Sequence, residues 1–283
     1  MSHFFKTGAH ATIYAKFRPT APQPLVDEII KFLAMKVSDR KLAIDVGCGP
    51  GISATIWAPY FEKVHGYDVS EAQINEAKAL NQFKNVSFSM SPAETIPEKD
   101  ESVQLVTVMQ AVHWFDLDKF YKEVTRVLVP NGVLALCSYL IPKPVSKNQE
   151  RMDSIIHNDI YKGVPNGYWS PAKDIIDNMY RDIHPAYEDH VRIDSIESRR
   201  EGTVAHYVNY TKTYCDSGEG SQGPHWRPGQ EEVPGAIGPD CGPVLLPHPQ
   251  ADSPAARGCA LLHCQQCHSP HQRHHGLPLP GAS

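Results

Sequence analysis

Apolar residues between positions 42 and 138 occur in short runs that alternate with longer, mostly polar segments. The short runs are rich in β-branched and aromatic residues, which is typical of strands. They lie at residues 43–46, 63–68, 86–88, 102–109 and 133–138. Five strands separated by helices or loops predict an α/β fold in which a parallel sheet has helices on both faces.

Two of the intervening segments show clear helix signals. Ser70-Glu71-Ala72-Gln73 is a capping-box pattern, and it predicts a helix that runs to about Leu80. Between residues 116 and 128 the apolar positions recur at helical spacing. Residues 131–132, Asn-Gly, then turn the chain into the fifth strand.

The first strand ends in an acidic residue and a dense glycine turn, residues 45–51. Glycines at 47, 49 and 51 allow positive φ and a close approach of the backbone to a ligand. A dinucleotide fingerprint would need glycine at position 52, which is Ile52. Asp45 would repel a pyrophosphate and attract a cationic group. The loop therefore favours a cofactor that carries an amino group, although Gly-Pro-Gly also occurs as a plain turn.

The second strand ends in Asp68, where folds of this kind bind ribose hydroxyls. Ligands of parallel sheets collect beyond the carboxyl ends of the strands, and Asp45, Asp68 and Gln110 all fall there. A solvated turn carboxylate is the alternative interpretation of Asp68.

These motifs resemble those of the class I S-adenosylmethionine (SAM)-dependent methyltransferases, within the methyltransferase type 11 group that includes trans-aconitate methyltransferases. The matching segments cover residues 1 to about 215. They are Tyr14, Phe17 and Arg18-Pro19, residues 45–51, Asp68-Val69-Ser70, Ala93-Glu94, residues 110–116 (Gln-Ala-Val-His-Trp-Phe-Asp), and residues 167–171 (Gly-Tyr-Trp-Ser-Pro). The resemblance implies a Rossmann-like SAM methyltransferase fold with a helical cover over the pocket.

The resemblance also implies a set of cofactor-binding residues. The loop would hold the methionine part of SAM, Asp68 its ribose, and Ala93 with Glu94 would lie along the adenine. Many relatives have an aspartate where this chain has Pro92, so adenine recognition would here use backbone groups. The expected cofactor-binding residues are Asp45, Gly47, Cys48, Gly49, Gly51, Asp68, Val69, Ala93, Glu94 and Gln110.

The expected acceptor site lies beside the transferred methyl group. His113 and Trp114 follow the fourth strand and are the candidate catalytic residues. His113 could act as a general base, but an ionised carboxylate acceptor has no proton to remove. The alternative for this pair is a buried aromatic plug.

Arg18 is a candidate for binding an anionic acceptor, because guanidinium matches a carboxylate. A surface ion pair is the alternative for Arg18. The other candidate substrate residues are Tyr14, Tyr168 and Trp169. The alternative for Tyr168 and Trp169 is that they pack the helical cover against the core.

Composition narrows the function classes. A net charge of -5, without a basic cluster interleaved with aromatics, gives no reason to expect nucleic-acid binding. No apolar run approaches the roughly twenty residues of a membrane span, and no signal-like core is present at the N-terminus. Cys48, Cys137 and Cys215 are scattered through the domain as expected for reduced thiols, so we expect a cytosolic protein that acts on a small molecule.

Composition changes abruptly near Asp216. Glycine and proline make up 21 of the last 68 residues, and lysine, tyrosine and phenylalanine are absent. Such a segment buries too little apolar surface to offset its ordering entropy, which predicts a disordered tail. The expected organisation is a methyltransferase domain at 1–215, with its core at 38–140 and its helical cover at about 141–200, followed by the tail at 216–283. A shifted reading frame or alternative exon would explain the change.

The tail has two further consequences for the sequence interpretation. Without the final strands of the family, the fifth strand would be an exposed apolar edge. The tail cysteines and histidines match zinc or c-type haem strings, but coincidence in a biased segment is the simpler account, and no metal is expected. They are Cys259, Cys264, Cys267, His268, His271, His274 and His275.

Three functions follow from these observations. The first is a SAM-dependent methyltransferase that acts on a small molecule, plausibly a carboxylate. The second is a catalytically impaired SAM-binding isoform, which the unusual C-terminus favours. The third, a nicotinamide-dependent oxidoreductase, is disfavoured by Ile52 and Asp45.

Overall fold

The computed structural model describes most of the first 140 residues and several later segments. The described residues are 8–140, 149–154, 172–184, 187, 189–198, 203–211, 213 and 258–264. Tyr168 and Trp169, which were expected near the substrate, lie outside them.

Five parallel strands form the centre of the fold, in the order β3-β2-β1-β4-β5. Their bounds are β1 Leu42–Val46, β2 Lys63–Asp68, β3 Val86–Met90, β4 Val103–Met109 and β5 Leu128–Tyr139. Each expected strand is present, which confirms the Rossmann-like fold. β5 begins at Leu128, five residues earlier than expected, because Leu128 already pairs with β4. The register then shifts around Asn131-Gly132 before the pairing continues at Val133.

Two antiparallel strands extend this sheet and correct the sequence interpretation. β7, Gly258–Cys264, pairs with β5, and β6, Asp189–Ile193, pairs with β7. The expectation that β5 is an exposed edge is therefore wrong. The expected disorder of the tail at 216–283 stays a prediction, and within that tail the structure describes residues 258–264 as β7. β6 also lies within residues 141–200, which were expected to form a helical cover.

The physical reason for the correction is local. Residues 258–264 read Gly-Cys-Ala-Leu-Leu-His-Cys, an apolar island without proline inside the proline-rich tail. β5 is buried along Val133–Ser138 and offers unpaired backbone groups on its outer side unless a strand joins it. The composition of the tail as a whole did not reveal this segment, because seven residues are enough for one strand but too few to change the average.

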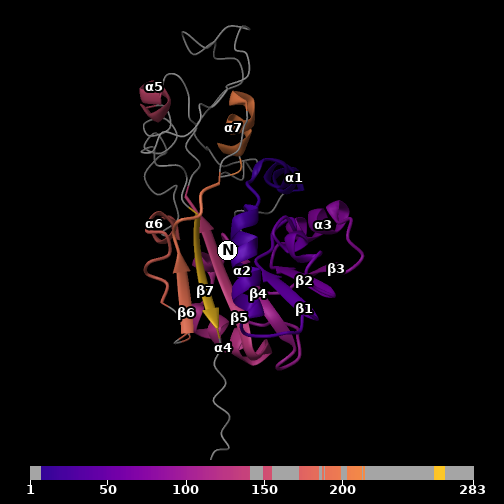
Figure 1. Ribbon diagram of the computed structural model, residues 1–283. Coiled ribbons are helices and arrows are strands. Elements are labelled where there is room, and N and C mark those ends of the chain that lie inside the picture. Colours follow the sequence, from indigo (N-terminus) through magenta and orange to yellow (C-terminus); the bar gives the residue numbers. More distant parts are fainter. Residues whose placement is uncertain are drawn as a thin grey trace, which may run out of the picture.

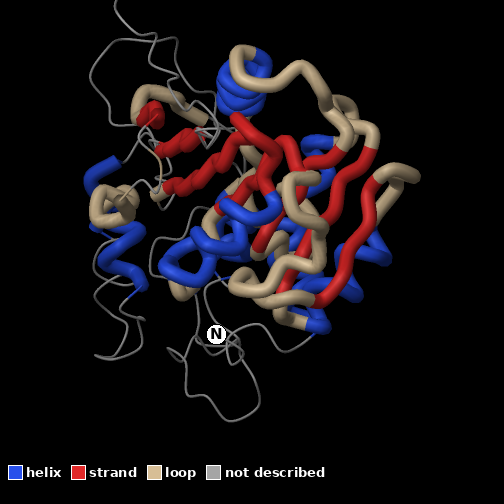
Figure 2. Tube along the Cα trace, turned by 90° about the horizontal axis from the view of Figure 1, so that it is seen from below, coloured by secondary structure: helices blue, strands red, loops and turns tan. Residues whose placement is uncertain are grey.

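Helices cover both faces of the sheet (Figure 2). On one face α2 (Gln23–Ala34), the 3₁₀ helix η1 (Ala54–Trp57) and α3 (Glu71–Leu80) pack through residues such as Ile29, Trp57 and Ile74. On the other face α4 (Leu117–Val127) packs through Phe120 and Val124. Strand residues divide between these two cores, so the core is a three-layer sandwich.

The predicted helix starts are confirmed, with one difference. Ser70 accepts a hydrogen bond from the Gln73 amide at 3.3 Å, and Asp116 accepts one from the Lys119 amide at 3.3 Å. The reciprocal half of the capping box is missing, because the Ser70 amide donates to Asp68 instead. The Gln73 side chain turns inward and is 3% exposed.

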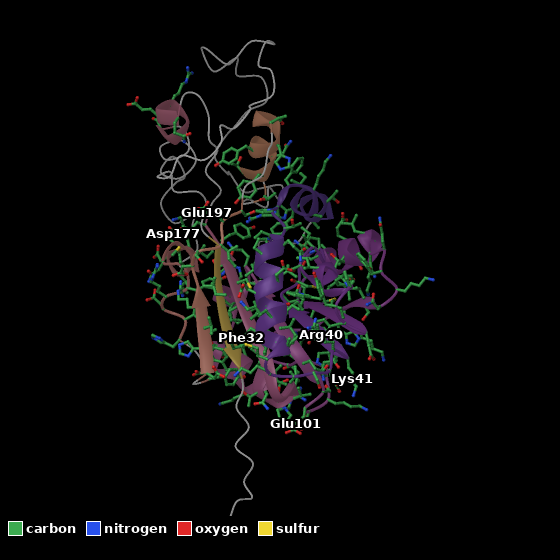
Figure 3. All side chains as sticks on the ribbon, in the orientation of Figure 1. Phe32, Arg40, Lys41, Glu101, Asp177 and Glu197 are labelled. Atoms are coloured by element: carbon green, nitrogen blue, oxygen red, sulfur yellow. The ribbon has the colours of Figure 1, made fainter. Side chains whose placement is uncertain are left out.

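A small cover lies over the carboxyl edge of the parallel strands. α1 (Gly8–Phe17) and α7 (Val204–Thr211) pack against each other above the upper ends of the strands in Figure 1. α5 (Gln149–Ser154) and α6 (Ala172–Asp177) are the helices described within the expected cover segment. Arg40, Lys41 and Glu101 mark the opposite edge of the sheet (Figure 3).

The described residues lack two features. Across these segments, no helix is both long enough and apolar enough to cross a membrane. The same segments contain no group of three or more potential metal ligands. Cys267 and the tail histidines fall outside the described ranges, so the interpretation of that string as coincidence stays a prediction.

The position of β7 predicts the effect of truncation. A chain ending at residue 257 loses β7, which exposes the β5 edge and leaves β6 without its partner. We expect its melting temperature to fall by at least about 5 °C and self-association to increase. Differential scanning fluorimetry and gel filtration would measure both effects. A chain ending at residue 264 is the matched control, and equal behaviour of the two chains would contradict the placement of β7.

Candidate functional site

Asp45 is the next-to-last residue of β1 and is fully buried. Its carboxylate accepts hydrogen bonds from the Ser53 hydroxyl at 2.5 Å and the Thr107 hydroxyl at 2.7 Å. Burial raises the pKa of Asp45 to about 6, although these two hydrogen bonds oppose the rise. Asp45 therefore connects β1 to Ser53, which follows the glycine loop, and to Thr107 on the neighbouring strand β4. Because Asp45 is buried, it stabilises the loop from below the protein surface.

The three loop glycines have positive φ, as expected, but for different reasons. A Cβ on Gly47 would lie 2.6 Å from Ala111 Cβ, and one on Gly51 would lie 2.6 Å from the Phe88 ring. These two glycines make room for the protein itself. Gly49 instead has free space beside its Cα atom, since a Cβ added there would have Gln73 Oε1 as its nearest atom, at 3.9 Å. A ligand can approach the backbone at Gly49.

Asp68 ends β2 and holds the other side of the loop. One carboxylate oxygen accepts the Gly49 amide at 2.9 Å and the other accepts the Ser70 amide at 2.9 Å. Burial raises the pKa of Asp68, although hydrogen bonds from these amides favour the ionised form. The alternative of a solvated turn carboxylate does not describe this side chain, which organises both the loop and the start of α3.

Gln110 follows β4 and has a positive φ of 59°. Its side-chain amide donates to the Tyr139 carbonyl at 2.9 Å and accepts from the Tyr139 amide at 3.0 Å. The side chain thus imitates one more pair of strand hydrogen bonds between the ends of β4 and β5. Both of its polar atoms are engaged, so its expected cofactor contact would use the backbone.

The remaining expected cofactor residues follow the strands β1, β2 and β3, and of these Ala93 and Glu94 were expected along the adenine. Val69 is 37% exposed and Ala93 is buried. Glu94 accepts a hydrogen bond from the Asp116 amide at 2.9 Å, so it anchors the start of α4. Cys48 is buried within the loop, and burial raises its pKa, which keeps its thiol neutral.

His113 lies in the 3₁₀ helix η2, Val112–Trp114, directly beyond β4. Its Nδ1 atom is 2.7 Å from the Tyr180 hydroxyl, and its ring centroid is 5.1 Å from that of Trp114. Burial, with a smaller contribution from the Arg18 charge, lowers the pKa of His113 to about 4. The imidazole is therefore neutral at physiological pH.

Arg18 joins the cover to the sheet. Its guanidinium donates to the Tyr139 hydroxyl at 3.2 Å and to the Thr213 carbonyl at 3.3 Å. It also lies over the rings of Tyr14 at 4.6 Å and Tyr210 at 5.5 Å. The alternative of a surface ion pair does not describe this arrangement, because the guanidinium is half-buried among aromatic rings and close enough to His113 to lower its pKa.

Tyr14 belongs to the same group. Burial raises its pKa to about 12, so the phenol keeps its proton. Arg18 therefore contacts Tyr14, and its charge acts on His113. The roles expected for these three residues stay predictions.

The sequence interpretation missed four residues that support this site: Ser53, Thr107, Tyr139 and Tyr180. Thr107 and Tyr139 had a usable signal, since each lies in a strand near its carboxyl end. Tyr180 is 67 residues from His113, and no local pattern connects the two.

A surface cavity of 350 Å³ lies between the glycine loop and the end of α3, and Gly51, an expected cofactor residue, is part of its lining. Pro50, Ile52, Ile56, Leu80 and Phe83 are among the residues that line it. None of His113, Arg18 and Asp68 borders it. Because it contains no group suited to the chemistry, we assign the candidate site to the strand ends and not to this cavity.

The glycine geometry predicts unequal effects of two matched substitutions. Gly49→Ala keeps free space but strains the left-handed backbone, at a cost of roughly 1 kcal/mol in unfolding free energy. Gly47→Ala adds a clash with Ala111, so we expect a loss of at least about 2 kcal/mol. Urea denaturation followed by circular dichroism would measure both values. Equal losses would show that the packing at Gly47 is looser than described.

Comparisons with known proteins agree with this geometry. The family profile described as "Methyltransferase domain" matches residues 44–136. A protein described as a methyltransferase in Dictyostelium discoideum is 37% identical over 188 residues, which is 66% of this chain and 68% of the relative. One described as an S-adenosylmethionine-dependent methyltransferase in Saccharomyces cerevisiae is 34% identical over 135 residues, 46% of this chain and 45% of that protein.

A solved structure supports the fold. It is described as a type II methyltransferase from Anaeromyxobacter dehalogenans, with a TM-score of 0.53, 22% identity, and coverage of 88% of this chain and 96% of that one. The sheet order, the glycine loop between two strand-terminal acids and the similarity to the Dictyostelium protein lead to one conclusion. The chain belongs to the class I S-adenosylmethionine-dependent methyltransferases.

Proposed function

We propose that this enzyme transfers the methyl group of SAM to a carboxylate of a small molecule. The observation that carries the proposal is the half-buried Arg18 guanidinium, which the cover places near His113. Guanidinium binds carboxylates through paired donors, and a site partly shielded from water strengthens that attraction.

The residues present fit SAM as the cofactor of the family. Gly49 leaves open space beside the backbone, and the buried Gln73 Oε1 atom next to it has no hydrogen-bond partner among the described residues. Asp45 and Asp68 add negative charge beneath and beside the loop. Such a surface suits a ligand with positive charge and hydroxyl donors. Asp68 and Gly49 are the residues best placed to hold it.

Neutral His113 is consistent with a carboxylate acceptor. Bound SAM supplies a methyl group already activated by a sulfonium, and an ionised carboxylate attacks without first losing a proton. A base is therefore unnecessary. Arg18 and His113 would orient the acceptor, while the aromatic rings of Tyr14 and Trp114 would limit access of water.

Carboxyl methylation can be tested on the wild-type enzyme. Small carboxylic acids, alcohols and amines would be offered with SAM, and both S-adenosylhomocysteine and methylated product would be measured. The proposal expects base-labile methyl esters from carboxylic acids. Turnover confined to alcohols or amines would reject it.

The free, buried thiol of Cys48 supports a reducing compartment. We therefore include a cytosolic location in the proposal.

Arg18 substitutions test how the acceptor is bound. We expect Arg18→Gln to raise KM for a carboxylate roughly tenfold or more, because a charge-assisted hydrogen bond is lost. The pKa of His113 should rise, since the Arg18 charge lowers it. Lys16→Gln removes a charge from the same helix and serves as the control. Unchanged KM in Arg18→Gln would show that the acceptor binds elsewhere.

The pKa of Asp45 predicts a pH dependence of SAM binding. Its carboxylate ionises as pH rises through about 6, and the cationic ligand favours the ionised form. SAM affinity should therefore increase between about pH 5 and pH 7. Titration calorimetry across that range would measure it, with Asp45→Asn expected to lose the dependence and the exposed Asp39→Asn expected to keep it. The same pH profile in Asp45→Asn would contradict the prediction.

A further inference from the structure

Tyr180 has an unusual backbone conformation. Both Met179 and Tyr180 have positive φ, 52° and 57°, directly after the helical turns of α6. Bulky residues rarely adopt this conformation, and it persists only where surrounding contacts hold it. The Tyr180 amide donates to the Ile175 carbonyl at 3.0 Å, which closes the end of the helix.

Two further contacts hold this conformation. The Arg192 guanidinium, on β6, donates to the Met179 carbonyl at 2.6 Å. The Tyr180 ring itself is completely buried in the core that also contains Val112 and Phe120. The strained turn is thus fixed from the sheet on one side and by packing on the other, and the ring cannot easily change direction.

The turn directs one polar atom toward the site. The Tyr180 hydroxyl lies 2.7 Å from His113 Nδ1, and the two ring centroids are 5.8 Å apart. His113 Nε2 makes no hydrogen bond to any residue in the described segments. A neutral imidazole has one N–H and one lone pair, so the partner of Nδ1 decides what Nε2 offers.

We propose that Tyr180 is a positioning residue whose hydroxyl donates to Nδ1 of His113, so that the proton of the imidazole stays on Nε2 and faces the acceptor. His113 then acts as a hydrogen-bond donor and not as a base. This inference rests on the proposed carboxylate acceptor, whose oxygen would accept from Nε2–H while Arg18 neutralises its charge. The low pKa of His113 supports a neutral donor at this position.

The arrangement has a consequence for substrate choice. A carboxylate gains both donors and needs no base. A hydroxyl or ammonium acceptor must lose a proton, and an imidazole whose Nδ1 is occupied and whose Nε2 is protonated cannot take it. Tyr180 would therefore help to select anionic acceptors.

Nitrogen NMR of the wild-type protein tests the tautomer directly. The chain would carry ¹⁵N-labelled histidine, and a His113→Gln sample would assign the resonances of His113. The inference expects a non-protonated Nδ1 and a protonated Nε2 at pH 7. A proton on Nδ1 in the wild-type enzyme would overturn it, whatever substrate the enzyme uses.

Tyr180→Phe tests whether the hydroxyl is responsible, because it keeps the ring. We expect the Nδ1–H form to become populated and KM for a carboxylate to rise on the order of tenfold, with SAM affinity unchanged. Tyr121→Phe is the matched control, since its hydroxyl donates to the distant His184 carbonyl at 3.0 Å. An unchanged tautomer in Tyr180→Phe, or a changed tautomer with unchanged KM, would overturn the inference.

The two proposals fail in different ways. If the enzyme methylates no carboxylate, the proposed function fails, while the wild-type spectrum still decides the tautomer. If Tyr180→Phe does not fold, the wild-type spectrum again decides. Esters formed by an enzyme with a proton on Nδ1 would leave the proposed function standing and reject the role of Tyr180.

Discussion

The hydrogen bonds of two strand-terminal carboxylates are the constraint on which this site depends. Asp45 binds Ser53 and Thr107, while Asp68 binds the amides of Gly49 and Ser70. Burying a carboxylate is costly unless its oxygens are satisfied, and each of these has partners. The loop between them is consequently held at both ends, and its glycines can keep a backbone conformation that other residues would resist.

Much of the sheet could be predicted, because its signals are local. The strand Lys63–Asp68 and the helix that begins after Ser70 follow from residues that are neighbours in the sequence. β6 and β7 could not be predicted in the same way. Their pairing joins residues 189–193 to 258–264. Residues 258–264 are an apolar run, but their choice of partner depends on the unsatisfied edge of β5, which lies far away in the sequence.

The same distinction between local signals and distant contacts applies to the candidate site. Asp45, Asp68 and His113 were predicted as site residues because acids and polar residues at strand ends commonly bind ligands in such folds. Tyr180 was not, because its importance comes from a helix end and a strained turn that packing brings to His113. Gln110 was predicted as a cofactor residue from its place after β4. In the structure its side-chain amide also bonds the Tyr139 backbone and so connects the ends of β4 and β5, a role that no local sequence pattern indicates.

The order of the strands has a consequence for synthesis. Among the described strands, β6 joins the sheet through β7, which is the last of them along the chain, whereas the parallel strands and the glycine loop come first. Arg192, which supports the turn before Tyr180, lies on β6. The glycine loop is therefore synthesised well before Arg192 and β7, which support the turn that places Tyr180 beside His113. If the proposed acceptor site is correct, the segment proposed to bind the methyl donor is synthesised well before the strands that complete the acceptor site.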